Sequence, residues 1–186
     1  VNVLKASKSD LVFAGTWGDG VYTSSDKGKN FQPKNIGLNN LYINDIAFDS
    51  KENIYIGTQG DGAYVSKNSG NLWTKLASDK DKNVTSIYVN PFNDNIIYIG
   101  TYGAGVFVST DAGATWEEKN RSKDNNGLNL AIESRYITSF AVTLDSTLLV
   151  GTYGDGLYRS TDKGNNWRRA NSGTGGTEFI NQISET

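Results

Sequence analysis

The sequence contains no cysteine, histidine or methionine, and it has two prolines in 186 residues. Without cysteine there is no disulfide, and without cysteine or histidine there is no thiolate or imidazole metal ligand and no nucleophile–histidine pair. We therefore expect neither a metal site nor a cofactor. Because the chain opens at Val1 instead of an initiator methionine, we expect it to be processed or excised from a longer protein.

The charges are few and nearly balanced. Lysine and arginine number 18, aspartate and glutamate 20, and the net charge is −2 with no run of basic residues. This balance gives no electrostatic attraction to nucleic acid or to a membrane surface. No apolar run is long enough for a membrane-spanning helix, and no signal peptide is visible. Nucleic-acid partners and membrane insertion are therefore not expected.

Glycine is abundant, with 21 residues, and much of it falls in one phrase that occurs four times. The copies are Gly15-Thr-Trp-Gly-Asp-Gly20, Gly57-Thr-Gln-Gly-Asp-Gly62, Gly100-Thr-Tyr-Gly-Ala-Gly105 and Gly151-Thr-Tyr-Gly-Asp-Gly156. Their first glycines are 42, 43 and 51 residues apart. A period of roughly 40–45 residues with four short strands per unit is typical of a propeller blade.

A second phrase, Ser-x-Asp-x-Gly-x-x-Trp, follows each copy of the first at a constant distance. Its carboxylate can accept main-chain hydrogen bonds across a turn, its glycine supplies a positive φ, and its aromatic ring can pack over the hairpin. Asparagine and phenylalanine can still fill these roles, so we predict a structural function and no calcium site. The positions are Ser24, Asp26, Gly28, Phe31; Ser66, Asn68, Gly70, Trp73; Ser109, Asp111, Gly113, Trp116; and Ser160, Asp162, Gly164, Trp167.

Alternation and glycine-rich punctuation divide each unit into four strands, which we name a, b, c and d. The second unit predicts them at 43–48, 53–58, 62–66 and 72–76. Elsewhere, strand a is predicted at 1–6, 84–89, 137–143 and 180–184, and strand b at 11–16, 96–101 and 148–152. The predicted units are 1–41, 42–83, 84–136 and 137–179, with 180–186 as the first strand of a further unit.

We therefore predict an all-β fold, a β-propeller of four-stranded blades with four blades and the first strand of a fifth, as part of a larger propeller. If the array does not close, its end blades expose apolar faces and strand edges. Self-association through those open end blades is one possible consequence.

The combined phrase resembles the Asp-box, or BNR, repeat of sialidases and of many bacterial propellers. It is most similar to bacterial tandem BNR-repeat proteins, a group related to sortilin-type propellers. The resemblance covers essentially the whole chain and implies the propeller fold. It does not specify an activity, because one fold hosts many functions. From the resemblance alone, the expected location is extracellular or in the cell envelope.

In an up-and-down blade, the b–c turn and the d–a link lie at one end, and the a–b and c–d turns at the other. The b–c turns would place aromatic or polar side chains near one mouth with carboxylates two residues on, a plausible surface for carbohydrate or peptide. The alternative is that the rings pack between blades. These candidate ligand-binding residues are Trp17, Gln59, Tyr102 and Tyr153, with Asp19, Asp61 and Asp155.

Catalysis has little support in the sequence. No arginine stands in the Arg-Ile-Pro context of sialidases, and the glycine phrase is followed by a strand, not by the helix that a phosphate-binding loop opens. A two-carboxylate glycoside hydrolase remains an alternative, but the aspartates recur with the repeat, and Glu133 is the one non-periodic candidate. Glu133 falls in an insertion, 117–136, interpreted as a solvated loop.

We therefore predict no catalytic residues and a non-catalytic extracellular or cell-envelope recognition or scaffold module that binds protein or polysaccharide through the b–c-loop face. Two alternatives stay open. The chain could be a fragment of a polysaccharide-acting glycoside hydrolase, or a structural module that assembles with copies of itself.

Overall fold

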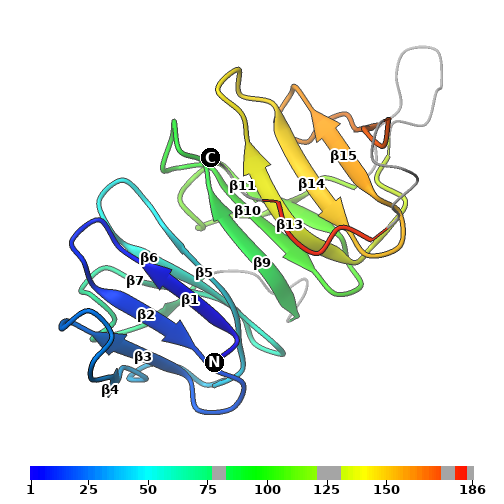
Figure 1. Ribbon diagram of the computed structural model, residues 1–186. Helices are drawn as coiled ribbons and strands as arrows, with labels where there is room; N and C mark the ends of the chain where they lie inside the picture. The colour runs from blue at the N-terminus through cyan, green and yellow to red at the C-terminus, as the bar shows by residue number, and fades with distance from the viewer. Residues whose placement is uncertain (77–82, 121–130, 173–178, 184–186) are drawn as a thin grey trace.

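The computed structural model describes residues 1–76, 83–120, 131–172 and 179–183 (Figure 1), which form sixteen short strands and no helix. The strands make four antiparallel four-stranded sheets, each in sequential order. The first blade contains β1 (Val3–Ala6), β2 (Val12–Gly15), β3 (Val21–Ser24) and β4 (Gln32–Pro33). The second contains β5 (Ile43–Phe48), β6 (Ile54–Thr58), β7 (Gly62–Ser66) and β8 (Thr74–Lys75). The third contains β9 (Val84–Val89), β10 (Ile97–Thr101), β11 (Val106–Ser109) and β12 (Glu117–Glu118). The fourth contains β13 (Ile137–Val142), β14 (Leu148–Thr152), β15 (Leu157–Ser160) and β16 (Arg168–Arg169).

The predicted propeller class and the four strands per unit are confirmed. Figure 1 shows the blades following one another from the blue N-terminal blade to the orange C-terminal blade. Contacts between blades run through strand a, from β1 to β5, β5 to β9 and β9 to β13. Strand b of the second and third blades is buried along its whole length because its two faces pack against different neighbouring blades. Strand d is two residues long in every blade and lies exposed.

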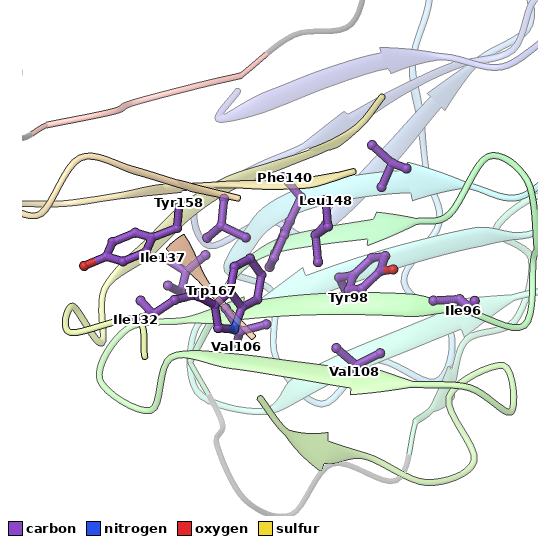
Figure 2. Packing of buried hydrophobic residues seen from close by; sticks show 12 residues of the cluster. Ile96, Tyr98, Val106, Val108, Ile132, Ile137, Phe140, Leu148, Tyr158 and Trp167 are labelled. Carbon is purple, nitrogen blue, oxygen red and sulfur yellow. The ribbon is translucent and has the colours of Figure 1, made fainter. Parts of the chain in front are cut away.

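The hydrophobic core is divided into three clusters, one at each junction between consecutive blades. Figure 2 shows the cluster at the third junction, where Tyr98 and Val106 of the third blade meet Phe140, Leu148 and Trp167 of the fourth. Burying an aliphatic or aromatic side chain of this size contributes roughly 1.5–3 kcal/mol. The blades are therefore held together by side chains that no single blade could bury alone.

The first glycine of each glycine phrase lies where the next blade approaches. A Cβ on Gly15 would lie 2.7 Å from Ile43 Cγ2 and 2.6 Å from Val3 Cγ1. A Cβ on Gly57 would lie 2.5 Å from Val84 Cγ1. Such distances leave no space for a methyl group, which explains why this letter of the phrase is glycine in all four copies.

A polar side chain near the start of strand a ties each blade to the next. The side chain of each of these residues donates a hydrogen bond to the main-chain carbonyl that opens the following strand a: Asn2 to Ile43, Asn44 to Val84, Thr85 to Ile137 and Thr138 to Ile180. Ile180 thus occupies the opening position of a fifth strand a. The predicted strand 180–184 is nevertheless not assigned over residues 180–183, and Ser184 lies outside the described residues. The described chain after 179 offers no partner strand with which a ladder could form.

The Ser-x-Asp phrase forms a tight turn between strands c and d. Gly28 N donates to Ser24 Oγ (2.9 Å), Ser24 Oγ to Asp26 Oδ1 (2.7 Å), and Asn30 N to the same carboxylate oxygen (2.9 Å). The Asn30 main-chain hydrogen bond, followed by those from the Asn30 and Ser24 side chains, lowers the pKa of Asp26 to about 2. Lys27 and Gly28 adopt positive φ values of 62° and 82°. This carboxylate is therefore used within the turn.

The tryptophan that ends this phrase does more than pack over its own hairpin. Trp167 packs against the turn glycine Gly164, and its Nε1 donates to Lys119 O of the preceding blade (2.6 Å). Trp73 makes the equivalent hydrogen bond to Lys34 O (2.7 Å). The indoles of Trp73 and Trp167 are thus struts between consecutive blades, an interaction that reading a single hairpin could not predict.

Candidate ligand-binding face at the blade junctions

The b–c turns and the d–a links meet at one end of the blades, and we call this surface the loop face. The third letter of each glycine phrase forms a β-bridge with the residue just before strand a of the next blade. The four bridged pairs, which we call junction pairs, are Trp17–Tyr42, Gln59–Asn83, Tyr102–Tyr136 and Tyr153–Phe179. The predicted candidates Trp17, Gln59, Tyr102 and Tyr153 therefore each lie at a blade junction, together with a partner from the link.

Main-chain hydrogen bonds join consecutive junction pairs into one row. Gln59 N donates to Tyr42 O (3.0 Å), and Tyr102 N to Asn83 O (3.0 Å). Tyr153 N donates to Tyr136 O (2.9 Å). We call the resulting series the junction row; in order, it contains Trp17, Tyr42, Gln59, Asn83, Tyr102, Tyr136, Tyr153 and Phe179.

The aromatic members of the junction row are exposed despite their ring contacts. Tyr102 and Tyr136 have ring centroids 4.5 Å apart, and Tyr153 and Phe179 4.8 Å apart. Even so, Tyr102 is 64% exposed and Tyr153 59%. The rings therefore pair at the junctions and still present apolar surface to solvent, so packing and ligand contact are compatible at these positions.

Sequence reasoning missed the link members of the row, Tyr42, Tyr136 and Phe179. The signal was present, because each stands immediately before the isoleucine that opens strand a or its equivalent. This signal is not periodic, because the d–a links differ in length and these residues do not fall at a constant distance from the glycine phrase.

The last two glycines of the phrase hold the link against the b–c turn. Gly18 N and Gly20 N both donate to Leu41 O, at 3.1 and 2.9 Å, and Gly103 N and Gly105 N donate in the same way to the Arg135 carbonyl. Gly18 and Gly20 have φ values of 117° and 79°, which side-chain-bearing residues rarely adopt. The glycine-rich turn thus binds a main-chain carbonyl of its own fold.

An asparagine after strand d clamps the same turn from the other side. Asn120 Oδ1 accepts a hydrogen bond from Val106 N (2.7 Å), and Asn120 Nδ2 donates to Ala104 O (2.6 Å). Asn35 and Asn171 make the matching contacts in the first and fourth blades. This clamp was also not anticipated from the sequence.

The carboxylates of Asp61 and Asp155 have partners within their own blades. Asp61 accepts a hydrogen bond from the Tyr64 hydroxyl, and it forms an ion pair with Lys75 Nζ (2.5 Å). Asp155 accepts a hydrogen bond from Tyr158 and pairs with Arg169. We call each aspartate, tyrosine and cation set a hub: Asp61, Tyr64 and Lys75 in the second blade, and Asp155, Tyr158 and Arg169 in the fourth. Burial, then the hydrogen bond to Asp61, raises the pKa of Tyr64 to about 12.

The third blade replaces all three hub positions at once. Ala104, Phe107 and Glu118 stand where the fourth blade has Asp155, Tyr158 and Arg169, and Glu118 pairs with Arg135 (3.1 Å). In the first blade Asp19 is exposed, Tyr22 lies opposite Pro33, and no cation occupies that position. Direct ligand contact by Asp19, Asp61 and Asp155 stays a prediction, and the hub geometry shows that two of them are occupied by scaffold contacts.

The insertion 117–136 is not simply a solvated loop. Glu117 and Glu118 form β12, and Ile132 is 2% exposed in the core between the third and fourth blades. Arg121, Lys123 and Asp124 lie outside the described residues. Glu133, the non-periodic carboxylate, pairs with Arg169 Nη2 at 3.1 Å. The solvated interpretation was wrong for Ile132 because an isolated apolar residue in a polar stretch gave no periodic signal of burial.

A hollow of about 750 Å³ lies along the strands a of the four blades. It is lined in part by Lys5, Asp45 and Tyr88. Asp45 accepts hydrogen bonds from Ile46 N (2.8 Å) and Ile87 N (3.0 Å), and its burial raises its pKa. Within the described ranges, no cluster of acidic side chains could hold a metal ion, and no helix could cross a lipid bilayer.

Comparison with known proteins identifies similar folds. An ancestral GH74 enzyme superposes with a TM-score of 0.74 at 23% identity, over 91% of this chain and 24% of that one. The extracellular domain of BT4673 from B. thetaiotaomicron gives 0.70 at 19% identity, over 97% and 24%. PorZ, a surface component of the type-IX secretion system of Porphyromonas gingivalis, gives 0.62 at 17% identity, over 84% and 24%.

These likenesses show the propeller fold, and the chain spans about a quarter of the length of each of these structures. No curated protein matches the sequence. The family model Sortilin-Vps10, described as sortilin, neurotensin receptor 3, matches residues 61–186, which include the last two blades and strands β7 and β8 of the second. The chain therefore belongs to the Sortilin-Vps10 family of β-propeller proteins.

Proposed function

We propose that this propeller segment is a non-catalytic recognition module that binds an extended partner, a polysaccharide or a polypeptide, along the junction row of its loop face. The observation that carries this proposal is the exposure of aromatic side chains in three of the four junction pairs. Flat apolar rings suit the faces of sugar rings and the side chains of an extended peptide.

The row is suited to an extended ligand because its members follow one another across all four blades. Its C-terminal half is continuously aromatic, from Tyr102 through Phe179, whereas Gln59 and Asn83 interrupt it at the second junction. The polar pair can donate and accept hydrogen bonds between two apolar regions. Backbone bridges fix the spacing of these residues, so that little conformational entropy is lost when a ligand binds.

The non-catalytic assignment is supported by the use of the acidic side chains. Asp61 and Asp155 each accept a tyrosine hydroxyl and a cation, and Glu133 pairs with Arg169. A general acid or base needs access to the proton that it transfers. An extracellular or cell-envelope location is part of the proposal, because two of the similar structures are an extracellular domain and a bacterial surface component.

The test is binding on an array of polysaccharides and on a library of extended peptides, followed by a hydrolysis assay on every polysaccharide that binds. We expect saturable binding without release of product. Turnover that Asp155→Asn abolishes would contradict the non-catalytic assignment. Retention by none of the probes would contradict the recognition role.

A further inference from the structure

We infer that the hubs of the second and fourth blades are positioning devices, which fix the incoming d–a link so that its tyrosine stands beside the aromatic residue of the preceding blade. This inference rests on the proposed function for its biological meaning, because it concerns the same junction row. Its structural part can be tested without any ligand.

In the fourth blade the hub holds the link that arrives from the third blade. Asp155 Oδ2 accepts a hydrogen bond from Ser134 N (3.3 Å), and Arg169 pairs with Glu133 (3.1 Å). Ser134 Oγ in turn accepts from Tyr136 N (3.2 Å). The hub therefore fixes the link two residues before Tyr136.

The second blade repeats the arrangement with different residues. Asn39 N donates to the Tyr64 hydroxyl (3.4 Å), which itself donates to Asp61. Asn40 Oδ1 accepts from Tyr42 N (2.9 Å), as Ser134 does for Tyr136. Asn40 and Ser134 also donate to the main chain of the neighbouring b–c turn, at Gln59 O (2.9 Å) and Tyr153 O (3.3 Å).

The third blade supplies the contrast. It has no hub, because Ala104 and Phe107 carry neither the carboxylate nor the hydroxyl, and the link that enters it ends in Asn83. The two blades with hubs therefore receive links that end in tyrosine, and the third blade, which has no hub, receives a link that ends in asparagine. This agreement accounts for Asp61 and Asp155 and for the alanine at position 104, and it leaves Asp19 of the first blade without such a role.

A hub acts by restricting the positions that the link and its tyrosine can adopt. An exposed tyrosine on an unanchored link would sample many positions, and a ligand would lose part of its binding free energy in ordering it. Anchoring the preceding residues removes that loss in advance. Asp61 and Asp155 thus act on the ligand through Tyr42 and Tyr136, which differs from direct contact by the carboxylates.

The experiment compares Tyr158→Phe, which removes the hub hydroxyl, with Tyr22→Phe as a matched control. Among the described residues, the hydroxyl of Tyr22 has no hydrogen-bond partner, and phenylalanine is natural at this position in the third blade, as Phe107. Amide hydrogen exchange of residues 133–136 is measured by mass spectrometry together with the urea midpoint of the whole chain. We expect Tyr158→Phe to accelerate exchange in this link about tenfold, and Tyr22→Phe to leave it unchanged.

Unchanged exchange in Tyr158→Phe would overturn the positioning role. If Tyr158→Phe unfolds the chain globally, Asp155→Asn provides the second variant, because it keeps the side-chain volume and removes the charge. Ligand binding then separates the two proposals. Tyr136→Ala without effect on binding would overturn the proposed function and leave accelerated exchange in the hub variants as evidence for positioning. Weakened binding in Tyr136→Ala with normal exchange in both hub variants would support the proposed function and overturn the positioning role of the hubs.

Discussion

The indole strut between consecutive blades allows a sharp test of what holds the array together. Trp73 and Trp167 are 2% and 1% exposed, and each donates Nε1–H to a carbonyl of the preceding blade. Replacing either by phenylalanine keeps an aromatic ring and removes the donor. The carbonyl of Lys34 or Lys119 then loses its partner in a partly buried place, which costs about 1–3 kcal/mol. For a chain of this size, each kcal/mol lowers the melting temperature by about 2–4 °C.

The chain contains its own control at Trp116, whose buried Nε1 has no hydrogen-bond partner among the described residues. Trp116→Phe removes an unsatisfied donor, so its cost is the lost ring volume without the hydrogen-bond term. We expect Trp73→Phe and Trp167→Phe to lower the free energy of unfolding by about 1–2 kcal/mol more than Trp116→Phe. Urea unfolding followed by far-ultraviolet circular dichroism measures this difference. Equal losses in all three variants would refute the strut.

Three further predictions concern packing and charge. Gly57→Ala should lower the free energy of unfolding by about 1–3 kcal/mol through a clash with Val84, and Val84→Ala should recover part of the loss in the double variant; no recovery in urea titrations would locate the strain elsewhere. Hydrogen bonds led by that of the Thr115 side chain lower the pKa of Asp111 from 3.8 to about 2, so its stabilisation is complete above pH 3.8 and is lost as the pH falls toward 2. Asp111→Asn, which imitates Asn68, should therefore lose less stability than the parent on acidification, and identical acid-unfolding curves would argue against this. Burial raises the pKa of Asp45, so the folded chain binds this proton more tightly and the free energy of unfolding falls as the pH rises through the folded pKa. Asp45→Ser, which imitates Ser86 and Ser139 at the equivalent position, should remove that fall, and its persistence would assign the pH dependence to another group.

The sequence predicted the blades because their signals are local and repeated. The turn from Ser24 to Phe31 depends on contacts within eight residues, and its hydrogen bonds follow from residue type and spacing. The position of strand b follows in the same way from alternation and from the glycine where the next blade approaches.

Most features of the junctions that the sequence did not predict involve contacts between blades. The partners of Trp17 and Tyr102 come from the links at Tyr42 and Tyr136, and the acceptor of Trp167 is a carbonyl in the preceding blade. Ile132 is buried by a neighbouring blade for the same reason. Such contacts depend on how blades are arranged in space, and no local pattern contains that information.

The central claim is that the aromatic members of the junction row bind the partner. Its most direct test is the dissociation constant of any array-selected polysaccharide or peptide for the parent chain, Tyr102→Ala, Tyr153→Ala and the control Phe92→Ala. Phe92 is 55% exposed but lies in an a–b turn, at the end of the blades away from the loop face. Removing one stacking ring at about 1.4 kcal/mol weakens binding about tenfold. The account predicts this loss for Tyr102→Ala and Tyr153→Ala and none for Phe92→Ala; equal affinity in all four proteins, or a loss confined to Phe92→Ala, would contradict it.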